Sequence, residues 1–161
     1  GRAQAVTKGV PLALTLSDVS MINFCKPGLD AMLGTGVDYL FCNEEEAQVW
    51  CGVTEQALVN AALAPLAKTV CLTRGAKGTL VLQGGQVHDV PGFPVKALDA
   101  NGAGDMFAGA FLYGLSEGMT APQAASLANK AASVVVAQRG NRLTTEGVRA
   151  LLSDWRALSA T

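Results

Sequence analysis

Short apolar runs that alternate with longer helical stretches constrain the fold of this chain more than any other feature. Three runs have the length and composition of buried strands, at residues 10–15, 38–42 and 70–73. Helical stretches follow them: residues 18–33, which Pro27-Gly28 interrupts, then 44–51, and 54–66 with Thr54 as the cap. Strands that alternate with helices are typical of α/β folds with a mostly parallel sheet.

From residue 79 onward the pattern changes. Residues 79–83 and 86–90 flank Gly84-Gly85, which is typical of a β-hairpin, and a further extended piece is expected at 93–97. Three helices are expected at 101–117, 120–138 and 144–158, the second with a capping box of Thr120 and Gln123. With 161 residues, of which 50% are hydrophobic and 16% charged, the chain is long enough for one α/β domain with a buried core.

Net charge and cysteine content indicate which partners and which cellular compartment to expect for the protein. A net charge of −1 gives no reason to expect nucleic acid or an anionic membrane as a partner, and the apolar runs are too short to span a bilayer. The four cysteines are irregularly spaced, and with His88 as the one histidine a zinc motif is not expected. We therefore expect free, mostly buried thiols in a reducing cytoplasm.

The chain begins with a helical stretch at residues 2–8 that leads directly into a buried strand. A parallel sheet that begins in this way lacks an outer edge and a first crossover connection. We therefore expect this sequence to be the second half of a larger protein.

The turn at residues 99–105, Asp-Ala-Asn-Gly-Ala-Gly-Asp, is the part of the sequence that indicates chemistry most directly. The small residues Gly102, Ala103 and Gly104 open a helix, and the first backbone amides of a helix lack intrahelical acceptors and attract phosphates. Asp105 lies within this turn, where a carboxylate would compete with a bound phosphate unless it had another role. Taking a proton from a hydroxyl group that attacks a phosphoryl group is such a role.

Other interpretations of this turn fit less well. Glycines could simply let the helix pack closely against a sheet, which explains Gly109 and Gly114 but not the acidic Asp105. A dinucleotide site would need the spacing G-x-G-x-x-G, and Phe107 occupies the place of the third glycine. The sequence also contains no P-loop motif.

Residues 43–46, Asn-Glu-Glu-Glu, directly follow a predicted strand, at the edge where α/β proteins form their sites. Helical spacing places Asn43 and Glu46 on neighbouring positions, where they can hold water around Mg²⁺ near a phosphate. The alternative is an ordinary helix start, with asparagine as the cap and acidic residues in the first turn. Together with the Asp105 turn, the functional interpretation is favoured.

Two further turns carry basic residues and glycines. Residues 73–78, Thr-Arg-Gly-Ala-Lys-Gly, could simply lead into the hairpin or could bind phosphates through Thr73 and the Gly75 amide, with Arg74 or Lys77 as a cation. The sequence does not decide between these two. Residues 139–142, Arg-Gly-Asn-Arg, have the composition of a helix end, for which we favour a structural role.

Residues 99–112, DANGAGDMFAGAFL, resemble the C-terminal signature of the PfkB (ribokinase-like) carbohydrate and nucleoside kinases. Residues 43–46 are similar to the N-x-x-E motif of that family, and residues 73–78 to its nucleotide-binding turn. The similarity covers essentially the whole chain in the family's order, with Ala100 as a departure at a position where threonine is usual. It implies a three-layer, ribokinase-like α/β sheet with flanking helices, without the family's N-terminal strands and lid.

The resemblance implies a role for each residue of the glycine turn. Asp105 would be the catalytic base on the acceptor hydroxyl group. The amides of Gly102, Ala103 and Gly104 would form the anion hole for the transferred phosphoryl group.

The other family motifs imply cofactor sites. Asn43 and Glu46 would organise Mg²⁺ and phosphates, Thr73 and Gly75 would hold ATP, and Asn129 would lie beside the adenine. A K⁺ site would involve Asp99 and the loop around Gly140.

Residues 1–161 would then form the nucleotide-binding and catalytic half of a kinase that transfers the γ-phosphoryl group of ATP to a hydroxyl of a sugar or nucleoside. The sequence of residues 101–105 favours the adenosine-kinase-like members of the family. Because the acceptor pocket and lid belong to the other half of the family's proteins, we expect the isolated chain to be inactive and its open sheet edge to need that half or a second copy. The alternative is a nucleotide-binding module without catalytic activity.

Overall fold

The computed structural model describes residues 2–138, 140 and 142–159. Contacts divide the chain into two compact units. The first unit consists of Gly1–Arg74 and Leu80–Asp89, and the second of Gly75–Thr79 and Val90–Thr161.

The sheet has five strands in the order β1-β2-β3-β4-β5, with β1 (Ala13–Thr15) at one edge. Strands β1, β2 (Val37–Asn43) and β3 (Ala67–Thr73) are parallel, and the register places Asn43 beside Thr73. Strands β4 (Thr79–Gln83) and β5 (Gln86–Val90) are joined by Gly84-Gly85, whose φ angles of 58° and 79° suit the tight turn of an antiparallel hairpin. The sheet is therefore mixed, and the predicted hairpin is confirmed.

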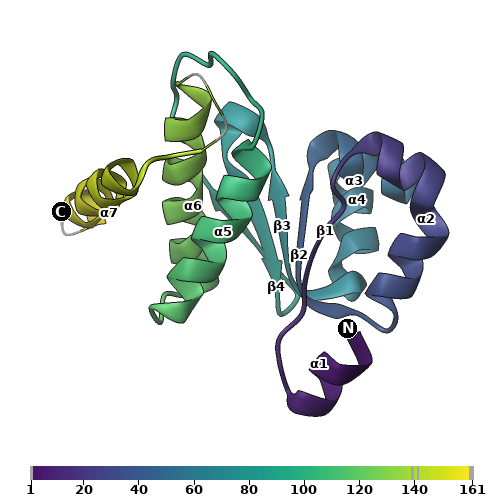
Figure 1. Cartoon of the computed structure of the whole chain (residues 1–161). Helices are drawn as coiled ribbons and strands as arrows, with labels where there is room; N and C mark the ends of the chain where they lie inside the picture. Colours follow the sequence, from purple (N-terminus) through teal and green to yellow (C-terminus); the bar gives the residue numbers. More distant parts are fainter. Residues whose placement is uncertain (1, 139, 141, 160–161) are drawn as a thin grey trace. The chain divides into compact units, whose positions relative to one another are not determined.

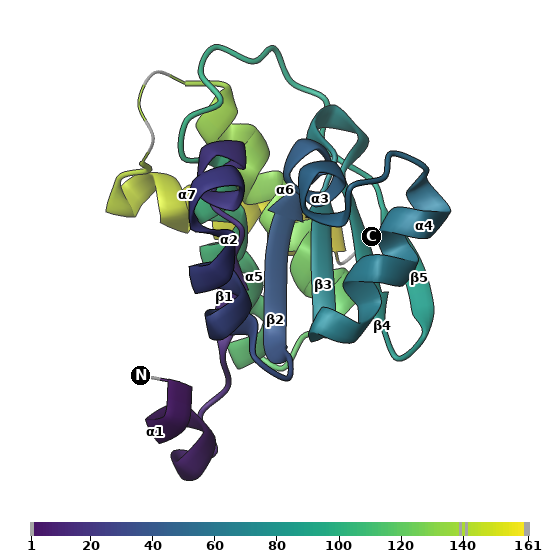
Figure 2. The ribbon, with the colours of Figure 1, turned by 90° about the vertical axis from the view of Figure 1, so that its right-hand side faces the viewer.

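Three helices lie on one side of the parallel strands of the first unit: α2 (Val19–Leu33), α3 (Glu44–Cys51) and α4 (Gln56–Leu63) (Figures 1 and 2). A short helix, α1 (Arg2–Lys8), precedes β1. The apolar core joins side chains of α2 and α4 to those of the strands. Its members include Ile22, Leu33, Leu40, Val59, Leu63 and Val70.

Several boundaries of helices and strands in the first unit differ from those predicted from the sequence. Strand β1 begins at Ala13 and not at residue 10, because Pro11 has no amide and the Leu12 amide donates to Asp38 Oδ2 at 2.8 Å instead. The expected interruption of α2 is a kink at Cys25 (φ −122°, ψ 15°), two residues before Pro27.

The predicted cap of α4 is wrong. Glu55, not Thr54, precedes the helix, and its side chain makes no capping hydrogen bond. Helix α4 ends at Leu63, and a short 3₁₀ turn, η1 (Ala64–Leu66), carries the chain to β3. Pro65 lies in this turn and cannot continue an α-helix, which explains why the predicted end at residue 66 is not α-helical.

Helices α5 (Ala103–Ser116) and α6 (Ala121–Val136) pack side by side in the second unit (Figure 1). Gly114 allows this close approach, because a Cβ atom there would lie 3.0 Å from the Cβ atom of Ala124. Phe107 and Phe111 of α5 are buried, with ring centroids 6.2 Å apart. Gln123 accepts a hydrogen bond from the Thr120 amide at 3.0 Å, as expected for the start of α6.

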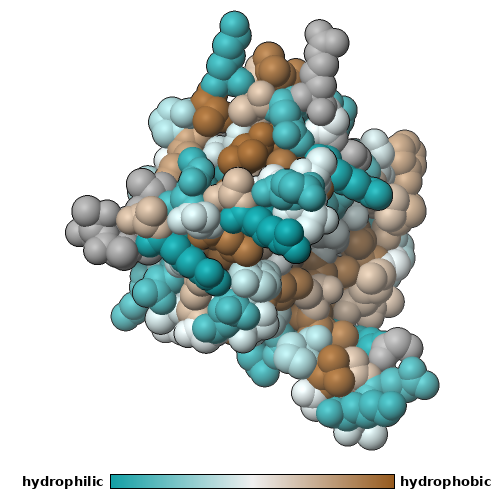
Figure 3. All heavy atoms as spheres, turned by 60° about the vertical axis from the view of Figure 1, so that its left-hand side comes forward, coloured by the Kyte–Doolittle hydropathy of each residue, from teal (hydrophilic) through white to brown (hydrophobic). Residues whose placement is uncertain are grey.

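The second unit also contains the 3₁₀ turn η2 (Gly75–Lys77) and helix α7 (Thr145–Ser159). The extended piece predicted at residues 93–97 is not a strand. Pro94 lies within that segment and has no amide N–H to donate to a neighbouring strand. Tyr113 and Val148 of this unit are exposed apolar side chains. Figure 3 shows apolar side chains among polar ones on the face that it brings forward.

All four cysteines are free thiols. Cys42 and Cys71 are buried, and burial raises the pKa of both thiols well above the usual range, so these two are unreactive. Cys51 is half-buried and Cys25 is exposed, so the expectation of buried thiols holds only in part. Among the described residues, no helix combines the length and the apolar composition needed to cross a membrane.

Candidate functional site

The first group of predicted site residues lies at the carboxyl ends of β2 and β3. Asn43 is the last residue of β2 and Thr73 the last of β3, and the two are paired in the sheet register. Glu46 follows in the first turn of α3. The fold therefore brings Asn43, Glu46 and Thr73 together at the sheet edge where ligands bind in α/β proteins.

Asn43 and Glu46 form a closed capping box at the start of α3. The Asn43 side chain accepts from the Glu46 amide at 2.8 Å, and Glu46 Oε2 accepts from the Asn43 amide at 3.0 Å. Glu46 Oε1 also accepts from the Asn43 side-chain amide at 2.7 Å. The capping hydrogen bonds of the alternative interpretation are therefore present, and they fix a buried carboxylate at the strand end.

Burial raises the pKa of the Glu46 carboxyl group, because the charged form loses hydration. The hydrogen bond from the Asn43 amide opposes this shift, and the negative charges of Asp18 and Glu45 add to it. Burial is the largest of these effects, so the raised pKa mainly reflects the loss of hydration around the Glu46 carboxylate.

The basic residue of the next turn is already paired. Arg74 forms an ion pair with Asp89 of β5, and the Arg74 side chain is only 13% exposed. Its Nε atom is buried and has no hydrogen-bond partner among the described residues. The neighbouring Thr73 hydroxyl group makes only a long hydrogen bond, 3.4 Å to the Cys42 carbonyl oxygen, which leaves it available to a ligand.

The second group of predicted residues lies at the start of α5. Gly102 is the N-cap residue, with a left-handed φ of 77°, and no side chain caps the helix. The Ala103 amide donates to the Ala100 carbonyl oxygen at 3.3 Å, and the Met106 amide makes the first helical bond, to Gly102. The amides of Gly102, Gly104 and Asp105 have no acceptor within the described part of the chain. This start has the features of an anion-binding site.

The Asp105 side chain is exposed and makes no hydrogen bond or ion pair with any described residue. It lines a cavity of about 560 Å³ whose walls are mostly apolar side chains of α5, α6 and α7. The lining residues include Met106, Tyr113, Leu127, Leu151 and Leu152, with Arg142 as a second charged group. Asp105 is thus neither buried in the core nor neutralised by a partner, as a catalytic base requires.

The predicted cation-binding residues lie near the end of α6. The amides of Leu98 and Asp99 both donate to the Val136 carbonyl oxygen, at 2.7 and 3.3 Å, which places this segment beside the last turn of α6. Asp99 Oδ1 accepts from the Asn101 amide at 3.0 Å. Gly140 has a left-handed φ of 96°, as a helix end requires, whereas Arg139 and Asn141 lie outside the described residues.

Asn129 of α6 has a buried side chain that the protein itself satisfies. Its Oδ1 atom accepts from the Thr79 hydroxyl group at 2.7 Å, and its Nδ2 atom donates to the carbonyl oxygens of Val90 and Pro91. None of these partners was foreseen from the sequence.

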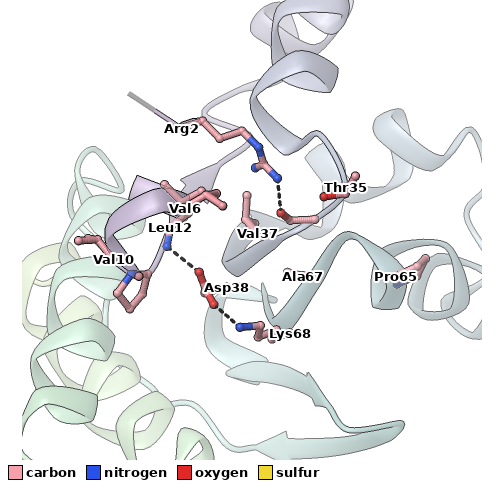
Figure 4. A pocket seen from close by; sticks show the side chains of 13 residues that line it. Arg2, Val6, Val10, Leu12, Thr35, Val37, Asp38, Pro65, Ala67 and Lys68 are labelled. Atoms are coloured by element: carbon pink, nitrogen blue, oxygen red, sulfur yellow. Dashed lines mark hydrogen bonds and ion pairs between the residues drawn. The ribbon is translucent and has the colours of Figure 1, made fainter. Parts of the chain in front are cut away.

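Another cavity, of about 660 Å³, lies at the opposite, amino ends of β2 and β3 (Figure 4). Asp38 there forms an ion pair with Lys68 at 2.8 Å and accepts from the Leu12 amide. Arg2 donates to the Gly36 carbonyl oxygen at 2.8 Å. These polar groups satisfy one another, so the cavity shows no donor set directed at a ligand.

The sequence analysis missed Asp18 and Arg142. Asp18 lies three residues after the end of β1 and caps α2, and its charge acts on Glu46. The signal was present, since a polar helix cap shortly after a strand is what drew attention to Asn43. Arg142 carries no such signal, because it reaches the cavity of Asp105 only through the packing of α7.

Known proteins share these motifs. Residues 3–146 match the family model of the pfkB family carbohydrate kinases. A ribokinase of Bacillus subtilis is 35% identical over 118 residues, which cover 71% of this chain and 39% of that protein.

Solved structures share the fold. The adenosine kinase of Sinorhizobium meliloti superposes with a TM-score of 0.84 and 28% identity, over 92% of this chain and 46% of that one. A putative ribokinase II of E. coli in complex with ATP and Mg²⁺ superposes with a TM-score of 0.79 and 21% identity, over 94% of this chain and 51% of that one, which shows the fold alone.

The chain spans about half the length of these solved structures and less of the ribokinase. The predicted ribokinase-like α/β fold is confirmed by these matches and by the mixed sheet with flanking helices. The family model covers far more than half of the sequence and includes every motif described above. The chain therefore belongs to the pfkB family of carbohydrate kinases.

Proposed function

We propose that this chain is the nucleotide-binding and catalytic part of an ATP-dependent kinase that phosphorylates a hydroxyl group of a sugar or nucleoside. One observation carries the proposal: the exposed Asp105 carboxylate, which has no partner among the described residues, lies in the first turn of α5 beside amides that likewise have no acceptor there. Family membership supports kinase chemistry in general. The residues that we propose carry it out are the ones described above.

Asp105 acts as the general base. It accepts the proton of the acceptor hydroxyl group while the acceptor oxygen forms a bond to the γ-phosphorus of ATP and the bond from that phosphorus to the bridging oxygen breaks, releasing ADP. A carboxylate without an internal partner remains available for this proton.

The start of α5 stabilises the charge of the transferred group. The amides of Gly102 and Gly104 are free to donate to phosphoryl oxygens, and the dipole of α5 adds positive potential there. The Ala103 amide, which closes the turn at a long 3.3 Å, would have to exchange that bond for a phosphoryl oxygen.

Asn43 and Glu46 serve the metal and the phosphates. A Mg²⁺ ion keeps most of its water and takes few protein carboxylates, so the partly engaged Glu46 and its capping partner fit such an ion held through water. When bound, Mg²⁺ neutralises charge on the phosphates. Thr73 and the Gly75 amide hold the ATP phosphates, and Asn129 borders the adenine.

A monovalent cation such as K⁺ would bind near Asp99 and Gly140. The hydrogen bonds that tie Asp99 to the last turn of α6 support this location. Asp99 Oδ1 already accepts from the Asn101 amide, so backbone carbonyl groups would supply most of the ligands.

The acceptor is a small sugar or a nucleoside, and the similarity to the S. meliloti adenosine kinase supports the latter. The acceptor pocket and lid would come from the part of the family's length that this chain does not span. Strand β1 ends the order of the sheet among the described residues, so that missing part or a second copy would cover its outer edge. We expect the 161-residue chain alone to show no robust ADP formation with a panel of sugars and nucleosides, and we expect the whole protein to be cytoplasmic.

The alternative is a module that binds nucleotide without catalysis, and Asp105→Asn separates the two. The variant is tested in a protein in which this chain is fused behind the segment of the S. meliloti adenosine kinase that it does not match. A catalytic base predicts that kcat falls by about 10²- to 10⁴-fold with the KM for ATP nearly unchanged. Asp154→Asn, on the exposed surface of α7, serves as the control. ATP binding without turnover in the unsubstituted fusion protein would support the module interpretation, whereas an unchanged kcat in Asp105→Asn would contradict the role of Asp105 as the base.

A further inference from the structure

The Asn129 side chain is one of the few buried polar groups of the protein, only 8% exposed. Its Nδ2 group faces two carbonyl oxygens, of Val90 at 3.2 Å and Pro91 at 3.1 Å, and carbonyls can only accept. Its Oδ1 atom accepts from the Thr79 hydroxyl group at 2.7 Å. The hydrogen-bonding capacity of this amide is therefore almost fully used within the protein.

The partners of Asn129 come from two segments that lie far from it in the sequence. Thr79 directly follows the turn of residues 75–78, which is proposed to bind the ATP phosphates, and Val90 ends β5 with Pro91 next to it. Thr79 is completely buried, so its hydroxyl group has no water to bond in place of Asn129. One residue of α6 thus holds the end of the turn and the end of the hairpin at the same time.

The two segments that Asn129 joins are also in tight backbone contact. Gly78 has a left-handed φ of 93°, and a Cβ atom there would overlap the Val90 carbonyl oxygen and the Gly92 nitrogen. A Cβ atom on Gly92 would lie 2.5 Å from the Ala76 carbonyl oxygen. Two glycines let the turn before β4 and the segment after β5 approach each other closely through their backbones. The Asn129 amide provides the fixed connection.

We propose that Asn129 is a positioning residue that holds the turn of residues 75–78 in its nucleotide-binding shape through Thr79 and Val90-Pro91, and does not itself hydrogen-bond the base. The inference rests on the proposed role of that turn in binding ATP. The Nδ2 group of Asn129 already donates to two carbonyl oxygens, so binding a ligand would require it to break a buried hydrogen bond. Breaking that bond costs more free energy than the new hydrogen bond would contribute.

A direct contact of Asn129 with the base and an indirect role through the turn predict different effects of removing the Thr79 hydroxyl group on ATP affinity. If Asn129 contacted the base through its amide, removal of the Thr79 hydroxyl group would leave ATP affinity unchanged. If Asn129 acts through the turn, Thr79→Val and Asn129→Leu disturb the same connection. Their effects on ATP affinity are then non-additive.

The test compares Thr79→Val with Thr79→Ser, which keeps the hydroxyl group, in the 161-residue chain. Thr69→Val is the matched control, since Thr69 is also a buried strand threonine, with its hydroxyl bonded to Gln83 at 2.9 Å. Amide hydrogen exchange measured without nucleotide should be about 10-fold faster at Gly78 in Thr79→Val than in the native chain. Thr79→Ser and Thr69→Val should exchange at the native rate at Gly78.

Calorimetry with ATP and Mg²⁺ supplies the second measurement. Thr79→Val should weaken ATP binding by about 5- to 10-fold, Thr79→Ser should restore it, and the double variant with Asn129→Leu should be no weaker than the weaker single variant. Unchanged exchange at Gly78, or faster exchange with unchanged ATP affinity, overturns the positioning role. A native chain that binds no ATP contradicts the proposed function instead, and the exchange rates still decide whether Asn129 fixes the turn.

Discussion

Helices α3 and α5 both begin with residues that family resemblance assigns to the active site, yet their first turns are built in opposite ways. At α3, the Asn43 side chain and the Glu46 carboxylate satisfy each other's backbone amides. At α5, the N-cap residue is Gly102, which has no side chain to offer, and nearby amides have no acceptor among the residues that the structure describes.

The difference separates a helix start that stabilises the fold from one that is left ready for a ligand. A closed capping box uses its donors internally and fixes a carboxylate at the end of a strand. An open start forgoes that stabilisation and retains donors and dipole for an anion. The four measurements below test this contrast.

Removing the capping box at the start of α3 should have the largest effect on the free energy of unfolding. Asn43→Ala removes the cap and leaves the Glu46 carboxylate without its bonds to the Asn43 side chain, so the free energy of unfolding should fall by about 2 kcal/mol. Denaturant titration followed by circular dichroism measures this change. Asn60→Ala within α4 is the control and should change stability by less than about 0.5 kcal/mol. A loss of that same small size for Asn43→Ala would mean that the box contributes nothing.

A side chain added at Gly102, the N-cap residue of α5, should destabilise the protein because it strains the backbone at that position. Gly102 has a φ of 77°, so Gly102→Ala should lower the free energy of unfolding by about 1 kcal/mol. Gly109→Ala is the matched control within the same helix, because a Cβ atom there meets nothing within 4 Å. It should raise stability by about 0.5 kcal/mol, since alanine favours the helix. Equal signs for the two variants would argue against the left-handed start.

The pH dependence of stability should report the buried carboxylate of the closed start. The folded-state pKa of Glu46 is raised above its ordinary 4.5, so Glu46 contributes stability below pH 4.5 that is lost as the pH rises through the raised pKa. Glu46→Gln lacks this titration. Its stability relative to the native chain should therefore increase between pH 4 and pH 7, apart from a constant offset for the altered hydrogen bond. A difference that stays constant or shrinks over this range would show that the pKa is not raised.

Inorganic phosphate should distinguish the two helix starts directly, although its binding will be weak. In amide chemical-shift titrations of the 161-residue chain, we expect saturable shifts at Gly102, Gly104 and Asp105, whose amides lack acceptors. The Glu46 amide should not shift, because it already donates to Asn43. Sodium chloride at matched ionic strength controls for screening. Equal shifts at both helices would remove the contrast between them.

Signals that are local in the sequence predicted local structure well. Asn43 before Glu46, and Thr120 before Gln123, have the spacing at which a side chain reaches a neighbouring amide, and both helix starts are as expected. Gly84-Gly85 between two short apolar runs predicted the hairpin for the same reason. Thr54 failed as a cap because α4 begins one residue later than the local pattern indicates.

The sequence by itself determined the α/β alternation, the family motifs and the identity of the groups that can do chemistry, since each of these depends on residues within a few positions of one another. Tertiary structure alone decided which of those groups are free: Asn129 is engaged by Thr79, fifty positions away, and Arg74 by Asp89, whereas Asp105 has no partner within the part of the chain that the structure describes. The physical reason is that a hydrogen bond or ion pair depends on distance in space, and only the folded chain sets the distance between residues far apart in the sequence.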